Sequence, residues 1–277
     1  MQISEINIYP IKSLGGISLN EAIIEQRGLQ YDRRWMLTDE NGKFLTQREF
    51  PKMSTISIIL AENGLQVSAE KFDDLIVPFE VEGERLKVEV WRSSCDAILC
   101  AKDINDWFSE VLQTNCNLVF MPEDSRREIN PLFNNNNDIV SFADGYPILI
   151  IGENSLADLN SRLETQIPMN RFRPNIVVAN SESFAEDNWG KIKIGETIYR
   201  STKPCARCVM TTINQTDGAF TGKEPLKTLA KYRLAKQVFP ATYADFDLSE
   251  NAVLFGQNLV AENFGKLIKV GDSLEVL

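Results

Sequence analysis

The sequence contains no histidine among its 277 residues. This absence excludes the catalytic sites that depend on imidazole, including a Ser-His-Asp triad, a Cys-His dyad and the His-Glu-x-x-His zinc motif. It also excludes a histidine-ligated haem and a facial-triad iron centre. Any chemistry must therefore depend on cysteine, carboxylates, lysine, arginine, tyrosine or a bound cofactor.

Positive charge is also scarce. The chain has 29 Lys and Arg against 39 Asp and Glu, which gives a net charge of −10. A general nucleic-acid binder needs a basic face to displace counterions, and docking on an anionic membrane surface needs one as well. Neither nucleic acid nor a membrane is therefore an expected partner. The acidic excess is typical of a soluble protein, or of one that docks on a basic redox partner.

Long apolar runs are missing too, and none approaches the length of a transmembrane span. The N-terminal residues lack the basic region followed by an apolar one that marks a signal peptide. The number of cysteines, five, is odd, which suits reduced thiols better than a secreted disulfide framework. These features together predict a cytoplasmic protein.

Short strands dominate the predicted elements of the first ~120 residues. Apolar-rich segments separated by turn residues predict strands over 3–9, 17–25, 34–38, 54–61, 65–69, 76–79 and 86–91. The tripeptide Glu62-Asn-Gly64 is a strong hairpin signal between two of them. Residues 103–112 have apolar side chains at helical spacing and predict a helix.

The stretch 121–137 changes character, because it is polar and contains four consecutive asparagines. It predicts a surface connection and is a candidate loop over a site. Beyond it, helices are predicted over 154–164 and 226–234, and strands over 146–151, 176–179, 191–194, 196–200, 254–260 and 266–277. The fold class is therefore mixed α/β and strand-rich, and the many short strands favour barrel-like curvature.

The sharpest local motif is Cys205-Ala-Arg-Cys208. A dithiol redox pair would open a helix after a strand, whereas Pro204 and a β-branched run place this pair at a loop-to-strand junction. A zinc site would need Cys95 and Cys100 as further ligands, and their spacing is loose. Two other interpretations stay open, which are a single thiolate ligand to a soft metal and a merely buried thiol.

An iron–sulfur site is a weaker alternative. The spacing of Cys95 and Cys100 matches the start of a plant-type ferredoxin motif, but Asp103 stands where the third cysteine should be.

Scattered cations form a second candidate constellation. Lys12 with Ser13, Arg33 and Arg173 each lie where a predicted strand meets a turn, a common place for ligand contacts. A phosphate or carboxylate ligand would require such cations to converge. Taken singly, each of these residues is an ordinary surface position.

Taken together, several segments resemble the MOSC-domain family, the family of the molybdenum cofactor sulfurase C-terminal domain, and most of all the amidoxime-reducing components and their bacterial relatives. The resemblance spans nearly the whole chain in the family's order. The matching segments are 8–13 (IYPIKS), 32–35 (DRRW), 155–163 (SLADLNSRL), 172–177 (FRPNIV), 185–189 (AEDNW), 204–212 (PCARCVMTT) and 254–258 (LFGQN).

This resemblance implies an N-terminal MOSC-associated β-rich domain over 1–120 and a MOSC β-barrel domain with peripheral helices over 121–277. A molybdenum pyranopterin cofactor would lie between them. By motif position, Cys208 matches the metal ligand, whereas Cys205 matches a neighbour that does not bind metal. Asp144 matches an acid near the metal. The residues that match the cofactor-binding set are Lys12, Ser13, Arg33, Arg173, Asn175 and Arg207.

The implied activity is the reduction of N-hydroxylated compounds such as amidoximes and hydroxylamines. No flavin fingerprint, Fe–S motif or haem ligand is present, so electrons would come from a separate partner, a small carrier with an NAD(P)H reductase. The substrate would be a small molecule, and pyridoxal phosphate is not expected. The alternative is a non-catalytic carrier of the cofactor or a sulfur-transfer binding module.

Overall fold

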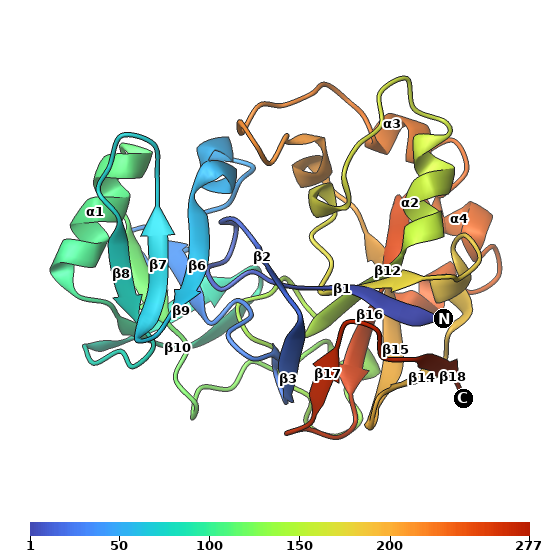
Figure 1. Ribbon diagram of the computed structural model, residues 1–277, viewed down its shortest axis with the longest axis horizontal. Helices are drawn as coiled ribbons and strands as arrows, with labels where there is room; N and C mark the ends of the chain where they lie inside the picture. The colour runs from blue at the N-terminus through green and yellow to red at the C-terminus, as the bar shows by residue number, and fades with distance from the viewer.

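The computed structural model describes all 277 residues and consists of two strand-rich halves that lie side by side (Figure 1). One half is built from the chain between residues 35 and 120, and the other from residues 121–277 together with the first 29 residues. The two termini lie close together at the far end of the second half (Figure 1).

The first half contains two antiparallel sheets. The four-stranded sheet has the order β5-β11-β10-β9, and the three-stranded sheet has the order β6-β7-β8. Their strands are β5 (Trp35–Thr38), β6 (Ser57–Ala61), β7 (Gly64–Ser68), β8 (Leu75–Pro78), β9 (Arg85–Val90), β10 (Ser93–Leu99) and β11 (Asn117–Phe120). The helix α1 (Lys102–Leu112) buries Ile104, Phe108 and Val111 against the three-stranded sheet and β5, as its apolar spacing predicted.

The second half is organised around an eight-stranded sheet. Its order is β18-β14-β15-β16-β12-β13-β1-β2, and only β12 and β13 pair in parallel. The strands are β1 (Gln2–Ile8), β2 (Ile17–Leu19), β12 (Ile148–Gly152), β13 (Ile176–Ala179), β14 (Lys191–Ile194), β15 (Thr197–Ala206), β16 (Leu254–Ala261) and β18 (Leu274–Val276).

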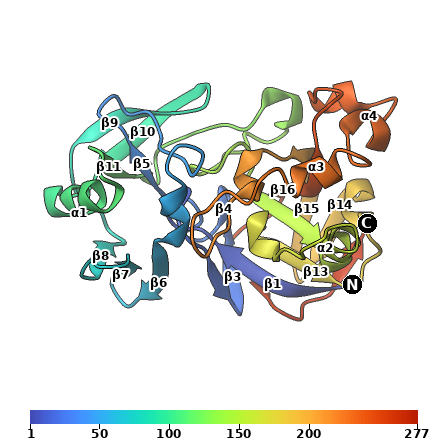
Figure 2. The ribbon, with the colours of Figure 1, turned by 90° about the horizontal axis from the view of Figure 1, so that it is seen from above.

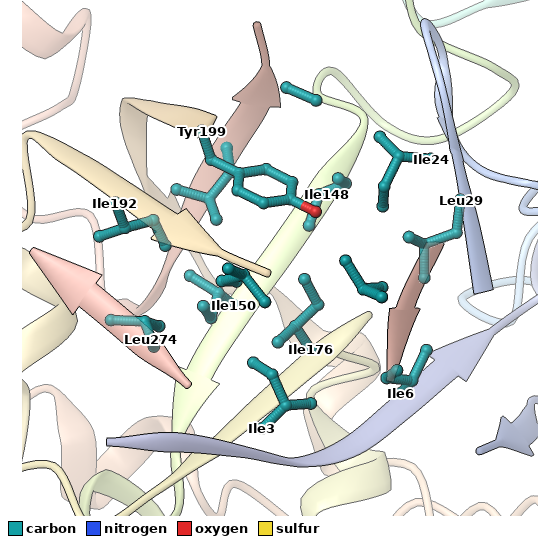
Figure 3. Packing of buried hydrophobic residues seen from close by; sticks show 14 of the residues in the cluster. Ile3, Ile6, Ile24, Leu29, Ile148, Ile150, Ile176, Ile192, Tyr199 and Leu274 are labelled. Carbon is teal, nitrogen blue, oxygen red and sulfur yellow. The ribbon is translucent and has the colours of Figure 1, made fainter. Parts of the chain in front are cut away.

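This sheet curls around its own core. A small sheet of β17 (Leu267–Lys269), β3 (Glu21–Glu25) and β4 (Gly28–Leu29) covers its open side. Ile6, Ile150 and Tyr199 are fully buried in the enclosed cluster, which Figure 3 shows converging from strands on all sides. A bridge between Gln2 and Ser273 links the two ends of the chain across the curl. The strand-rich mixed fold and its barrel-like curvature are therefore confirmed.

Helices are few and short, and those of the second half gather together on its outside (Figure 2). They are α2 (Glu153–Asn160), α3 (Leu226–Leu229) and α4 (Ala235–Val238). Six 3-10 turns complete the structure, at Pro51–Thr55, Pro131–Phe133, Met169–Arg171, Ala185–Asn188, Val209–Thr212 and Tyr243–Phe246.

Three details correct the sequence predictions. The helix predicted over 226–234 is a single turn, and Leu234 instead forms a bridge with Val253. The strands β10 and β11 were not predicted, since β10 buries only the small side chains of Cys95 and Ala97 and so has little apolar alternation. The connection 121–137 is not only a surface segment, because Arg127 is buried within it.

The predicted domain boundary at residue 120 divides the sequence, but the two halves of the structure are not divided at the same point. In space, β1 to β4 pack with the C-terminal half, so the chain crosses between the halves more than once (Figure 1). Of the predicted site residues, Lys12, Ser13 and Arg33 lie on the connections that follow β1 and β4, whereas the others belong to the C-terminal half.

Candidate functional site

All eight predicted site residues line one cavity between the two halves. They come from segments far apart in the sequence, which are the turn after β1, the turn before β5, the loop before β12, the turn before β13 and the end of β15. The residues are Lys12, Ser13, Arg33, Asp144, Arg173, Asn175, Arg207 and Cys208.

Backbone conformation aims several of these side chains into the cavity. Ser13, Arg33 and Arg173 have positive φ angles of 68°, 49° and 55°. A left-handed conformation is costly for residues with a β-carbon and persists only where surrounding structure holds it. Here the Arg33 N–H donates to the carbonyl of Tyr9 at 3.0 Å, so the turn is tied to the end of β1.

Lys12 and Asp144 form an ion pair within the cavity. The Lys12 ammonium donates to the Asp144 carboxylate at 2.5 Å and to the carbonyl oxygen of Phe142 at 2.8 Å. Burial lowers the pKa of Lys12 to about 8, although Asp144 opposes this shift. Burial would by itself raise the pKa of Asp144, but its carboxylate is 61% exposed, and Lys12 and Arg48 hold that pKa well below its usual range.

Two arginines stack on a single buried tyrosine. The guanidinium carbons of Arg33 and Arg173 lie 4.2 and 4.1 Å from the ring centroid of Tyr9. Arg33 is compensated by the buried carboxylate of Asp32 at 2.6 Å. Arg173 has no such partner, and its buried Nη2 makes no hydrogen bond. Burial accordingly lowers the pKa of Arg173 to about 10.

Asn175 is already fully engaged with the protein. Its side-chain oxygen accepts from Arg33 at 3.2 Å and from the N–H of Leu149 at 3.1 Å, while its amide donates to the carbonyl of Asn7 at 3.1 Å. It therefore links β1, β12 and the turn before β13, and holds Arg33 in place. Its predicted contact with a cofactor stays a prediction.

The two cysteines of the motif are held differently. Cys205 lies within β15, and Cys208 follows the end of this strand, so the motif is a strand-to-turn junction and not the predicted loop-to-strand junction. Arg207 donates to the sulfur of Cys205 at 2.9 Å, whereas Arg48 donates to the sulfur of Cys208 at 3.2 Å. The cation beside Cys208 is therefore Arg48 and not its sequence neighbour.

Three residues at the site were missed in the sequence. Arg48 and Arg171 line the cavity, and Trp91 donates its indole N–H to Asp144 at 3.2 Å from the rim. No predicted strand ends beside Arg48, so the pattern that marked the other cations does not mark it. Nothing local marks Trp91, because only the packing of the β9–β10 hairpin brings it to the cavity.

The other cysteines do not join the motif. Cys95 and Cys100 are buried in the cores of the first half, and all five cysteines are unpaired. No group of three or more Cys, Asp or Glu side chains lies close enough to hold a metal ion. The zinc interpretation with Cys95 and Cys100 is therefore wrong, because the fold separates the ligands that it requires.

The cavity suits an anionic ligand with a thiolate-bound centre. Six cations line it against the single carboxylate of Asp144, in a chain whose net charge is −10. A buried guanidinium without an acceptor is costly, and the unpartnered atoms include Arg171 Nε, Arg173 Nη2 and Arg207 Nε. Phosphate oxygens would supply acceptors for such groups. The donor set therefore fits a phosphorylated pterin whose metal is bound by one cysteine.

Comparison with known proteins agrees with this geometry. Residues 1–115 match the MOSC N-terminal beta barrel domain and residues 137–275 match the MOSC domain, so the chain belongs to the MOSC-domain family.

Individual relatives extend the likeness over nearly the whole chain. Mouse mitochondrial amidoxime-reducing component 1 is 34% identical over 99% of this chain and 82% of the relative. Human mitochondrial amidoxime-reducing component 1 is 33% identical over the same shares. Bovine mitochondrial amidoxime reducing component 2 is 33% identical over 98% of this chain and 81% of its own length. In the structure of this chain, no helix has the length and apolar character needed to cross a membrane.

Proposed function

We propose that the chain is a molybdenum-cofactor-dependent reductase of N-hydroxylated compounds, among them amidoximes and hydroxylamines. The observation that carries the proposal is the convergence of an accessible thiol, six cations and one carboxylate in a single cavity. The likeness to proteins named amidoxime-reducing components supports the choice of substrate class.

The overall reaction consumes two electrons and two protons. The N–O bond of R–NH–OH breaks, the nitrogen is released as R–NH₂, and the oxygen leaves as water. The bound molybdenum centre would supply the two-electron chemistry, and the protein would supply binding, orientation and electrostatics. We assign the metal-ligating thiolate to Cys208, because this residue matches the metal-ligating cysteine of the family by motif position.

The cationic wall would hold the cofactor. Lys12, Arg173 and Arg207 present charge to the cavity, and Ser13 adds a hydroxyl beside them. Arg33 would act with them, positioned by Asn175. Charge-assisted hydrogen bonds to phosphate are worth more than neutral ones, so this set can retain an anion in an acidic protein.

Asp144 is placed to handle a proton. Its carboxylate is exposed to the cavity, and it accepts from Lys12 and from the indole N–H of Trp91. The flanking cations keep the Asp144 carboxylate ionised. It would therefore orient a water molecule, or the protonated side chain of Lys12, beside the departing oxygen. The acid near neutral pH would be Lys12, whose pKa of about 8 lies within reach of proton transfer.

Electrons would arrive from a separate protein, a small carrier reduced by an NAD(P)H-dependent reductase. Five unpaired cysteines suit a reducing compartment, and we propose the cytoplasm for this chain, although the relatives named above are called mitochondrial.

The test is direct. The chain would be produced in a host that makes the cofactor, its molybdenum content measured, and the protein mixed with benzamidoxime and reduced viologen under argon. We expect benzamidine in amounts that match the viologen oxidised, at two electrons per product. Full molybdenum occupancy without turnover of amidoximes, hydroxylamines or hydroxamic acids would favour the cofactor carrier or sulfur-transfer module instead.

A further inference from the structure

Arg48 differs from the other cations of the cavity in having no oxygen partner while remaining partly exposed. Its side chain donates to the sulfur of Cys208 at 3.2 Å, and its guanidinium carbon lies 4.7 Å from the ring centroid of Trp91. No carboxylate or carbonyl oxygen accepts a hydrogen bond from it. A guanidinium has five N–H donors, so most of its hydrogen-bonding capacity is unused within the protein.

The indole beneath Arg48 is held on several sides. Trp91 occupies the tip of the β9–β10 hairpin with a positive φ of 59°, its N–H donates to Asp144, and its ring meets Phe44 edge to face at 5.1 Å. Nevertheless 49% of the residue is exposed. An exposed aromatic side chain on a strained backbone is a costly arrangement that is retained where it serves a site. Here the ring lies against the Arg48 guanidinium.

We propose that Arg48, supported by Trp91, is a specificity-determining residue that selects substrates carrying a carboxylate next to the N-hydroxyl group. This inference rests on the proposed reductase function and names a substrate class within it. A planar guanidinium binds a carboxylate through two parallel hydrogen bonds, and stacking on an aromatic face pre-organises it for this contact. Arg48 adjoins the thiol of the proposed metal ligand, so a carboxylate held there lies beside the reacting N–O bond.

The other cations of the cavity are not available to bind a substrate carboxylate. Lys12 is engaged by Asp144 and a carbonyl oxygen, and Arg33 is engaged by Asp32 and Asn175. Arg173 is buried against the ring of Tyr9, at 9% exposure. Arg171 and Arg207 already donate to the carbonyl oxygens of Thr211 and Phe172. Arg48 is thus the cation that a small acid entering the cavity meets with donors to spare.

The first experiment needs no cofactor. In a Cys205→Ser background, the thiol of Cys208 is alkylated with iodoacetate, which carries a carboxylate, and with iodoacetamide, which is its neutral counterpart. Any change in thiolate content affects both reagents alike, so the ratio of the two rates isolates recognition of the carboxylate. The remaining cysteines, Cys95, Cys100 and Cys116, are buried.

Arg92 provides the matched control. It is the next residue after Trp91, is exposed, and does not line the cavity. We expect Arg48→Gln to lower the iodoacetate-to-iodoacetamide ratio by about tenfold or more, the loss of one charge-assisted contact. Arg92→Gln removes the same charge nearby and should leave the ratio within about twofold, as screening of an exposed charge implies. Equal losses in the two variants, or none in Arg48→Gln, would overturn the proposal.

The second experiment uses the molybdenum-loaded protein with N-hydroxyglycine and its neutral amide. Arg48→Gln should reduce kcat/KM for the acid relative to the amide by about tenfold, mainly through KM. Arg48→Lys keeps the charge without the planar fork. Its ratio of kcat/KM for the acid to that for the amide should therefore lie between those of the wild type and Arg48→Gln. If the protein reduces neither compound nor any amidoxime, the reductase function fails, and the alkylation ratio still decides whether Arg48 recognises carboxylates. If both compounds are reduced with an unchanged ratio in Arg48→Gln, the substrate assignment is wrong.

Discussion

At the scale of single residues, the two cysteines of one motif should behave differently. We expect Cys208→Ser to abolish reductase activity and to weaken retention of molybdenum, because an alcohol is a much harder ligand than a thiolate. Cys205→Ser should be tolerated, since Cys205 lies at the end of β15 and is engaged by Arg207. The measurements are metal content and turnover of the two purified variants. Equal losses in both would indicate a redox pair or a site that uses both cysteines.

The buried cations Arg173 and Lys12 should matter more for binding the cofactor than for the stability of the fold. Arg173→Ala and Lys12→Ala each remove a charge-assisted contact worth about 1.5–3 kcal/mol, which corresponds to a roughly tenfold to hundredfold loss of affinity. Arg173 in particular makes no hydrogen bond within the protein that folding would lose. Cofactor occupancy, measured from pterin and molybdenum content, should fall in both variants. The thermal unfolding midpoint should stay near that of the wild type in Arg173→Ala and should fall modestly in Lys12→Ala, because the carbonyl of Phe142 loses its donor. Normal occupancy in both variants would remove these residues from the site.

The pKa of Lys12 predicts how anion binding depends on pH. Burial lowers this pKa to about 8, and an anion that prefers the charged ammonium must raise it again. Affinity should therefore be constant below pH 8 and fall above it, by up to about tenfold per pH unit until the raised pKa is reached. Calorimetry with sulfate, whose charge is constant over this range, measures the effect. In Lys12→Met the decline above pH 8 should disappear; a wild type with a flat profile would contradict the assignment.

The sequence predicted those site residues that a local pattern marks and missed those that only tertiary packing brings to the cavity. Lys12, Arg33 and Arg173 each lie where a predicted strand meets a turn, a common place for ligand contacts, and all three line the same cavity. Arg207 is adjacent to Cys208 in the chain, yet the strand geometry directs its side chain to Cys205. Trp91 reaches the cavity only through tertiary packing, which no local pattern records.

At the scale of elements, Arg127 connects the segment 121–137 to the cavity. Its buried guanidinium donates to the carbonyls of Ser141, Ala143 and Asp144 at 2.6–2.8 Å and to the hydroxyl of Ser93 at 2.8 Å. It thereby fixes the loop that carries Asp144 against the β9–β10 hairpin. This role was invisible in a segment whose composition indicated only a polar surface.

Replacement of Arg127 by Met should therefore destabilise the protein. The three carbonyls would lose their donor, and each unsatisfied buried group costs about 1–3 kcal/mol, partly offset because Arg127 has no carboxylate partner. We expect a net loss of roughly 2 kcal/mol in the free energy of unfolding, measured with urea. Arg126→Met, at the exposed neighbouring position, is the control and should change stability by less than about 0.5 kcal/mol. Equal stabilities of the two variants would show that the loop is held by other contacts.

The elements themselves were predictable where apolar spacing is strong. The helix α1 and the hairpin β6–β7 appear at nearly their predicted bounds, because their apolar side chains mark one face clearly. Predictions failed where tertiary contacts decide the structure, as at Leu234, which was predicted to be helical and forms a bridge with Val253. The return of β1 to β4 to the C-terminal half is likewise a property of pairing over long sequence distances.

At the scale of the whole molecule, charge is distributed unevenly. The chain carries a net charge of −10, yet its main cavity is lined by six cations. The cavity between the halves can therefore attract anions while the outer surface repels them. An acidic outer surface also favours encounter with a basic partner, which bears on the source of electrons.

That source can be tested on the isolated chain. No Gly-x-Gly-x-x-Gly follows a strand, so a dinucleotide site is not indicated, and each turnover still requires two electrons. We expect the molybdenum-loaded protein to be inactive with NADH alone and active with a reductase and a small electron carrier, or with reduced viologen. If the carrier binds this protein through electrostatic attraction, the turnover rate with the carrier should fall as the salt concentration rises. The turnover rate with viologen, a small molecule, should change less. Turnover with NADH and no added carrier would reveal a redox site within this chain that neither its sequence nor its cavity indicates.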